Sequence, residues 1–132
     1  MSIFHVSNEK KIIFTKKAPK ALGPYSQAVE KNGTLYISGQ VPVNPETGTM
    51  PEGIQEQTEQ VMNNIGSILE EAGYTFDQVV KSTCLLSDMD NFKAMNEVYG
   101  KYYKENPPAR AAFGVVQLPL GALIEIETIA MK

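Results

Sequence analysis

The spacing of apolar residues predicts two amphipathic helices. Between Gln55 and Ala72, apolar residues recur every three or four positions, as on a helix with one buried face, and Gly73 follows as a natural C-terminal stop. A second helix is expected to begin near Asp90, because aspartate is a good helix cap. It must end before the two prolines at 107 and 108. The apolar stripe of this helix consists of Phe92, Met95, Tyr99 and Tyr102.

Short runs of β-branched and aromatic residues, bounded by turn residues, predict the strands. Lys11 to Thr15 and Thr34 to Gly39 are two such runs, and Lys31 to Gly33 marks the end of a strand between them. A Gly-Pro pair at 23–24 bends the chain, so Ser26 to Glu30 is expected to extend into an N-terminal hairpin. The other predicted strands are Asp77 to Asp88, Ala109 to Leu118 and Ala122 to Met131, with a short Pro-Leu-Gly turn joining the last two.

This order, β-β-α-β-α-β-β, predicts an α+β single domain whose helices lie on one face of the sheet. The two-residue period of the last strand divides its residues between the two faces. One face receives Leu123, Glu125, Glu127 and Ile129, and the other receives Ile124, Ile126, Thr128 and Ala130. Because helices can cover only one face, the half-apolar second face is expected to be buried against another subunit.

Composition indicates one globular domain and favours a reducing compartment. Of the 132 residues, 42% are hydrophobic and 20% are charged, which is typical of a folded, soluble protein. No apolar run is long enough to cross a bilayer, and the first residues lack the layout of a secretory signal, so the cytoplasm is favoured. The single cysteine, Cys84, agrees with this location. A net charge of -3 makes nucleic acid an unfavoured partner.

The residues that most metal and cofactor sites require are scarce. One histidine, His5, and one cysteine, Cys84, cannot assemble a His/Cys metal cluster within a chain. The sequence has no phosphate-binding loop, no dinucleotide fingerprint and no HExxH motif. ATP, dinucleotides and zinc are therefore disfavoured, and no cofactor is expected. His5 is expected to be incidental and Cys84 to be an inert buried thiol.

Arg110 is the only arginine, in a chain that otherwise uses lysine for positive charge. It follows two prolines and opens a predicted strand, so its backbone is held while its side chain can reach a cleft at the end of the strand. The planar guanidinium binds a carboxylate through two parallel hydrogen bonds, which an ammonium group cannot reproduce. The alternative is an ordinary ion pair with an acidic residue at a subunit contact.

Glu125 and Glu127 are candidate acid-base groups because they share one face of a strand. At a rise of roughly 3.3 Å per residue their Cα atoms lie about 6.5 to 7 Å apart. In a cleft with hydrophobic walls, the pKa of one carboxyl group rises, and that group can then accept or donate a proton near neutral pH. The alternative is a solvated strand face or pairing with lysines.

Other candidate residues have equally simple structural interpretations. Asn96 lies one turn after Phe92 and can direct its amide toward the sheet, or it can be an exposed polar residue. Tyr25 can place its phenol in a pocket or pack within a loop. Ser38 and Gly39 end a strand, where the glycine either lets a ligand approach the backbone closely or makes a bend.

Several motifs occur together and in order: GPYSQAV, YISGQVPVNPETG, DMDNFKAMNEVYGKYY, PPARAAFGV and IEIETIAM. They resemble the Rid family, also called YjgF or reactive intermediate deaminase A. The likeness runs from about Ala18 to the end, and the first ten or so residues fall outside it. It implies a chorismate-mutase-like α+β fold and a homotrimer. In clefts between subunits, enamine and imine intermediates such as 2-iminobutanoate and 2-iminopropanoate would be hydrolysed to 2-keto acids and ammonia.

The resemblance also implies a role for each candidate residue. Arg110 would clamp the substrate carboxylate and Glu125 would orient the attacking water. Many relatives carry a cysteine where this chain has Ala112, so a thiol role is excluded there, while the backbone carbonyl is retained. No cofactor would be needed. The residues that would line or support the pocket are Tyr25, Ser38, Gly39, Asn96 and Ala112.

Two other functions stay open at the level of sequence. A trimer could capture small keto or imino acids and signal through a partner without chemistry. Some members of the family have been assigned endoribonuclease or translation-inhibitor activity. The acidic isoelectric point of about 5.2 and the lack of a catalytic histidine argue against the ribonuclease.

Overall fold

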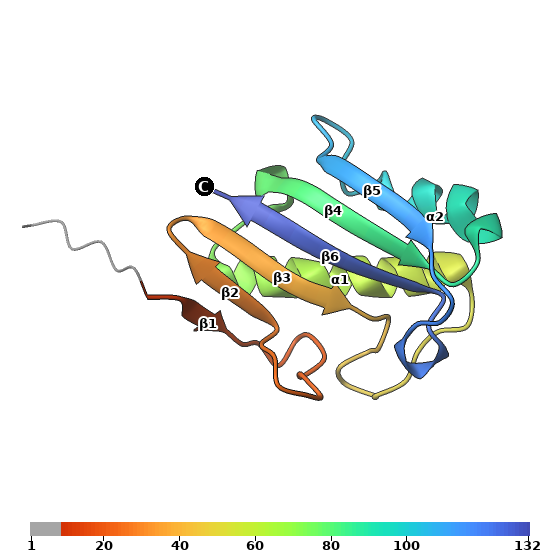
Figure 1. The fold of residues 1–132 in the computed structure, drawn as a ribbon, viewed down its shortest axis with the longest axis horizontal. Helices are drawn as coiled ribbons and strands as arrows, with labels where there is room; N and C mark the ends of the chain where they lie inside the picture. The colour runs from red at the N-terminus through yellow and green to blue at the C-terminus, as the bar shows by residue number, and fades with distance from the viewer. Residues whose placement is uncertain (1–8) are drawn as a thin grey trace, which may run out of the picture.

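The computed structural model describes residues 9–132, which form six strands and two α-helices (Figure 1). His5 lies outside the described residues. Single 3₁₀ turns occupy 76–78, 89–91 and 119–121. The elements, in chain order, are β1 (Lys11–Ile13), β2 (Ala28–Lys31), β3 (Thr34–Gln40), α1 (Ile54–Ala72), β4 (Val79–Leu86), α2 (Phe92–Tyr99), β5 (Ala109–Gly114) and β6 (Ile124–Met131).

The strands form one mixed sheet in the order β1-β2-β3-β6-β4-β5. Neighbouring strands are antiparallel except β4 and β5, which are parallel. Figure 1 shows both helices behind the sheet and none in front of it. The predicted α+β class, with helices on one face, is confirmed. Three strands rather than two precede α1, because Lys11–Ile13 pairs with β2 as a separate edge strand.

The predicted N-terminal hairpin is formed by β2 and β3. Its two turn residues, Asn32 and Gly33, both have positive φ, at 51° and 78°. Two-residue turns of this kind match the twist of the strands they join, and Asn-Gly is their preferred sequence. The turn sets the register that brings Ala28 opposite Ile37.

Helix α1 begins and ends where the apolar period predicts, with Gly73 in the left-handed conformation at φ 79°. The second helix begins near Asp90, as predicted, but Asp90 does not cap it. Asp88 caps the 3₁₀ turn at 89–91, where its side chain accepts a hydrogen bond from the Asp90 N–H. Helix α2 follows this turn at Phe92 and has no side-chain cap. The helix ends at Tyr99, and Tyr102 lies beyond it.

The two faces of the sheet differ sharply. Toward the helices, β6 buries Ile124, Ile126, Thr128 and Ala130, as its alternation predicts. On the uncovered face, cross-strand partners form an apolar row that includes Ile12, 54% exposed, and Tyr36, 52% exposed. The complete row is Ile12, Val29, Tyr36 and Ile129. No α-helix within residues 9–132 is long and apolar enough to span a bilayer.

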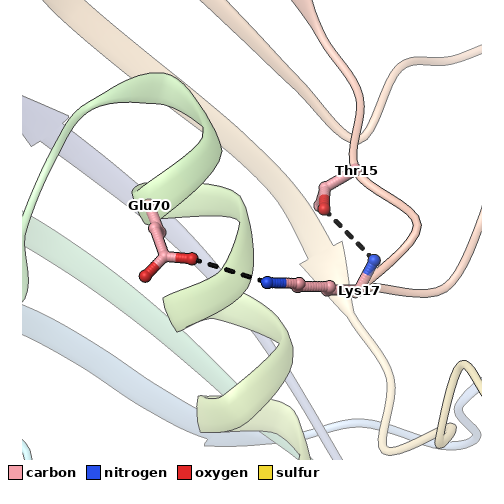
Figure 2. A network of polar contacts seen from close by, with 3 residues as sticks. All are labelled: Thr15, Lys17 and Glu70. Atoms are coloured by element: carbon pink, nitrogen blue, oxygen red, sulfur yellow. Dashed lines mark hydrogen bonds and ion pairs between the residues drawn. The ribbon is translucent and has the colours of Figure 1, made fainter.

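The loop after β1 is attached to the rest of the molecule in two ways. Figure 2 shows Lys17, whose N–H donates to the Thr15 Oγ1 at 3.1 Å and whose Nζ lies 3.9 Å from Glu70 Oε1 on α1. Both side chains of that ion pair are more than three-quarters exposed, so it stabilises the loop little. The stronger attachment is the buried amide of Gln27, which binds the backbone from Thr15 to Pro19.

Candidate active site

Arg110 is the second residue of β5 and lies against α2. Its Nη1 donates a hydrogen bond of 2.7 Å to Asn96 Oδ1. The guanidinium carbon lies 5.3 Å from the ring centre of Phe92 and 5.0 Å from that of Tyr99. These three helix residues occur at 92, 96 and 99, so one stripe of α2 presents ring, amide and ring to the cation.

The guanidinium retains donors for a ligand. Arg110 is exposed, and within residues 9–132 no carboxylate lies at ion-pair distance from it. Asn96 accepts a hydrogen bond from Nη1 alone, whereas a guanidinium carries five N–H donors. Of the two alternatives for Asn96, the structure shows the amide directed toward the sheet. Among residues 9–132, Arg110 forms no ion pair with an acidic residue.

Glu125 lies on the uncovered face of the sheet, in register with Leu85, whose partner on its other side is Phe113. Burial among these groups raises the pKa of the Glu125 carboxyl group, and the nearby charge of Glu127 raises it further. Both causes disfavour the ionised form. A carboxyl group of this kind can exchange a proton closer to neutral pH than an ordinary glutamate can.

Gly39 makes room for the Glu125 side chain. The β3–β6 register is broken between Ile37 and Gln40, so a bulge places the Gly39 backbone beside the carboxyl group. A Cβ at Gly39 would lie 2.9 Å from Glu125 Cδ and 3.2 Å from Cγ. Gly39 thus lies where the register breaks and leaves space for the Glu125 side chain. The approach of a ligand to its backbone stays a prediction.

Ser38 and Tyr25 belong to the same side of the molecule as Glu125. The Ser38 hydroxyl donates to the Ser26 carbonyl at 2.6 Å, so it holds the loop that carries Tyr25. Tyr25 is 53% exposed and lines two adjoining hollows, of about 550 and 690 Å³. The first is also lined by Gly39, and the second by Ser38 and Glu127.

Buried amide side chains hold the loops around the site, two of them the loops that line the first hollow, and sequence reasoning missed them. Gln27 Nε2 donates to the carbonyls of three loop residues, and Asn64 Nδ2 donates to those of Val41 and Val43. Gln57 Nε2 donates to the Pro51 carbonyl while its Oε1 accepts from the Leu123 N–H. The available signal was that Gln57 and Asn64 fall on the apolar stripe of α1.

One chain does not bring Arg110 and Glu125 together. Arg110 is the register partner of Ser82, and Glu125 is the register partner of Leu85. Partners across a ladder share a face, while residues three apart on a strand lie on opposite faces. Arg110 and Asn96 therefore lie on the helix side, and Glu125, Gly39 and their neighbours lie on the uncovered side.

Ala112 and Cys84 are register partners on the helix side. Ala112 is half-buried and packs against the core. Cys84 is buried, and burial raises the pKa of its thiol to about 11 despite the opposing effect of Arg110. The thiol is therefore protonated and inert at neutral pH, as expected. Within the described range no three His, Cys, Asp or Glu residues are grouped to hold a metal ion.

A family model described as Endoribonuclease L-PSP matches residues 15–132. The chain belongs to this family, which includes the Rid proteins. A protein from Yersinia pestis described as a member of the conserved Rid family is 47% identical, with a TM-score of 0.90 over 94% of this chain and 100% of that one. The family recognised from the motifs is thus confirmed.

Two other members of the Endoribonuclease L-PSP family bear on chemistry. The mouse protein named 2-iminobutanoate/2-iminopropanoate deaminase is 49% identical over 124 residues, covering 93% of this chain and 92% of that protein. The structure of E. coli TdcF contains bound serine. It is 36% identical, with a TM-score of 0.90 over 92% of this chain and 98% of that one. Deaminases and small amino-acid ligands therefore occur among close relatives.

Proposed function

We propose that the protein is a hydrolase that needs no cofactor and acts on 2-iminobutanoate and 2-iminopropanoate. The products are the 2-keto acids and ammonia. The observation that supports this proposal most is the state of the Arg110 guanidinium. It is fixed by Asn96, is exposed and has no carboxylate partner among residues 9–132. A guanidinium with free N–H donors can bind the carboxylate of a small imino acid through two parallel hydrogen bonds. The name of the mouse relative supports the choice of substrate.

The proposed enzyme is a homotrimer with its sites in clefts between subunits. Arg110 and Glu125 cannot meet around one small substrate within a chain, because they lie on opposite faces of the sheet. Two protomers can supply one residue each. The apolar row of the uncovered face supports such packing, since exposed apolar surface of this kind favours association. Tyr25, Ser38 and Gly39 would then accompany Glu125, and Asn96 and Ala112 would accompany Arg110.

In the proposed chemistry, Arg110 binds the substrate and Glu125 accelerates the reaction. Arg110 grips the carboxylate equally in the substrate and in the transition state, so it lowers KM and leaves the barrier to other groups. Glu125 accepts a proton from water as the water oxygen bonds to C2 of the protonated imine. The same carboxyl group then delivers that proton to the amine nitrogen. The C2–N bond breaks as the C2 hydroxyl becomes the carbonyl of the 2-keto acid, and the hydroxyl proton passes to the departing ammonia, which leaves as ammonium. General base catalysis of this kind contributes about 10²- to 10⁴-fold.

The test is ammonia release from 2-iminobutanoate generated freshly by a pyridoxal-phosphate enzyme. Protein should accelerate release, and Glu125→Gln should abolish most of the acceleration. A release rate that is the same with and without protein would remove the deaminase and favour a binder of keto or imino acids. We also propose a cytoplasmic location, with which the single buried thiol of Cys84 agrees.

Endoribonuclease activity is the second candidate, because the family model carries that description. The described residues contain no histidine, and the net charge of the chain is -3, so neither a histidine base nor a basic surface supports it. RNA cleavage that persists in repurified Glu125→Gln protein would favour the ribonuclease over the deaminase.

A further inference from the structure

Four buried hydroxyl groups gather on the helix side of the sheet. Their side chains are 0% exposed for Ser82, 1% for Thr128, 6% for Tyr99 and 7% for Tyr103. Within the described residues none of these four hydroxyl oxygens has a hydrogen-bond partner. Apolar side chains of similar shape would avoid the cost of burying them, so simple packing does not account for the cluster.

The cluster is joined to Arg110 through the sheet. Thr128, Ser82 and Arg110 are successive register partners across β6, β4 and β5, and partners across a ladder share a face. The Arg110 side chain therefore extends from the end of a row whose other two members are buried hydroxyl residues.

The cluster is also joined to Arg110 through α2. Tyr99 presents its ring to the guanidinium at 5.0 Å, while its hydroxyl is one of the four buried groups. The Tyr103 ring lies 4.8 Å from the Tyr99 ring and 5.7 Å from that of Phe76. Tyr99 thus has one face on the cation, a second aromatic ring as neighbour, and its polar end in the cluster.

The Ser82 hydroxyl lies close to both phenol groups. Ser82 lies near enough to both tyrosines to lower the pKa of each, although no pair of these oxygens has hydrogen-bonding geometry. Burial has the larger effect and raises the pKa of both phenols, so each keeps its proton at neutral pH and can donate. Two to four polar neighbours of this kind are what an internal water molecule requires.

We propose that Tyr99 is a positioning residue for Arg110, and that the hydroxyls of Ser82, Tyr103 and Thr128 anchor Tyr99 through an internal water. With its hydroxyl fixed, the ring cannot tilt, so it sets the plane of the guanidinium that rests on it. The expected effect on KM rests on the proposed function. The orientation of the guanidinium does not, because it can be measured without any substrate.

Nuclear magnetic resonance provides that measurement, because Arg110 is the only arginine and its Nε–Hε resonance needs no assignment. In the wild-type protein, stacking on the rings should shift this resonance upfield of its position in urea. Tyr99→Phe, which keeps the ring, and Ser82→Ala should each lose at least about half of that shift or broaden the signal, since the ring can then tilt. Ser82→Thr keeps a hydroxyl and should restore it.

Tyr102→Phe is the matched control, because Tyr102 lies near the same end of the helix but is not among the buried unpartnered hydroxyls. Its Arg110 resonance should match wild type. A wild-type resonance in folded Tyr99→Phe and Ser82→Ala proteins would overturn the proposal. If Ser82→Ala does not fold, Thr128→Val and Tyr103→Phe take its place and decide the question in the same way.

Enzyme kinetics provide a second test of whether Tyr99 positions Arg110. Tyr99→Phe should raise KM by roughly three- to tenfold and leave kcat within about twofold, because a misaligned fork weakens ground-state and transition-state binding alike. A purely structural role would lower the melting temperature without this split, and that result would contradict positioning. If wild-type protein releases no ammonia, the proposed function fails while the resonance still tests Tyr99.

Discussion

Arg110 and Glu125 lie on opposite faces of one sheet, on strands separated only by β4. The cation faces α2, where rings and an amide hold it, and the carboxyl group faces the side that no helix covers. If both groups act on one small substrate, each site must combine residues from two protomers. This arrangement makes the origin of each site residue testable with inactive variants.

Mixing two impaired variants should restore part of the activity when it is assayed at substrate concentrations below KM. Arg110→Lys supplies an intact Glu125, and Glu125→Gln supplies an intact Arg110. When the two are unfolded together in equal amounts and refolded, random trimers should regain about a quarter of wild-type ammonia release, since each mixed trimer contains one complete cleft. The double variant, refolded alone or with either single variant, is the control and should stay inactive. No recovery in the mixture would place both residues in one protomer's site.

Arg110→Lys by itself should keep the fold and the assembly but lose most deaminase activity. Lysine retains the charge, yet it cannot make two parallel hydrogen bonds to a carboxylate. We expect kcat/KM to fall by at least about tenfold, mainly through KM. Steady-state ammonia release checks the activity, and sedimentation checks the assembly. Turnover equal to wild type would remove the carboxylate clamp.

Glu125→Gln should be at least as stable as wild type at neutral pH. The pKa of the Glu125 carboxyl group is raised in the folded protein, so its contribution to stability is present below the unfolded pKa and is lost as pH rises through the folded pKa. Because glutamine does not ionise, the variant does not lose this stability as the pH rises. The melting temperature of the variant relative to wild type should therefore increase from pH 4 to pH 7, with Glu46→Gln, an exposed loop residue, as the unresponsive control.

The raised pKa of the Glu125 carboxyl group should also appear in the pH dependence of kcat/KM. Only ionised Glu125 accepts a proton from water, so kcat/KM should rise with pH through a value above that of an ordinary glutamate. Glu127→Gln removes the neighbouring charge and should move this rise of kcat/KM to lower pH. If the rise stays at the same pH, Glu127 has no electrostatic effect on the catalytic step.

Gly39→Ala should impair catalysis more than folding. The added Cβ would meet the Glu125 side chain, with 2.9 Å to Cδ, so the carboxyl group must move away from its position. We expect kcat to fall by about 10²-fold, a loss typical of a displaced catalytic group. Gly23→Ala is the control, because its Cβ would make ordinary contacts of 3.6 and 3.7 Å with Tyr25. Unchanged kcat in Gly39→Ala would remove Glu125 from the chemistry.

Gln27→Ala should detach the loop that follows β1. The change deletes the bonds to Thr15, Ala18 and Pro19 and leaves the Thr15 N–H without its acceptor. At about 0.5 to 1.5 kcal/mol for each of the four lost bonds, we expect the free energy of unfolding to fall by about 2 to 6 kcal/mol. Urea denaturation measures the loss, and amide exchange at Thr15 should accelerate. Lys17→Ala, which removes only the exposed ion pair, should change stability little.

Periodicity predicted the elements whose signal is local. The apolar spacing of α1, the alternation along β6 and the Asn-Gly turn after β2 each depend on neighbouring residues, and the structure confirms them. Element ends were less certain, because Asp88 and Asp90 are equally good caps in sequence. Only the fold shows that the Asp88 side chain receives the Asp90 N–H.

Relations between distant segments could not be predicted. The separation of Arg110 from Glu125 depends on β5 pairing with β4 in parallel, and nothing in either strand's own sequence specifies that partner. The rings beneath Arg110 were interpreted as core residues, because Phe92 and Tyr99 fit the apolar stripe of a helix. Their contact with the Arg110 guanidinium depends on β5 lying beside α2, which neither sequence segment reveals.

If Arg110 and Glu125 act on one substrate, the two-sided placement of these residues makes catalysis a collective property of the assembly. An isolated protomer would then carry only half of each centre, so diluting the protein until it dissociates should abolish turnover while every subunit stays folded. A substitution in the apolar row from Ile12 to Ile129, far from any reacting atom, would then imitate the loss of a catalytic group.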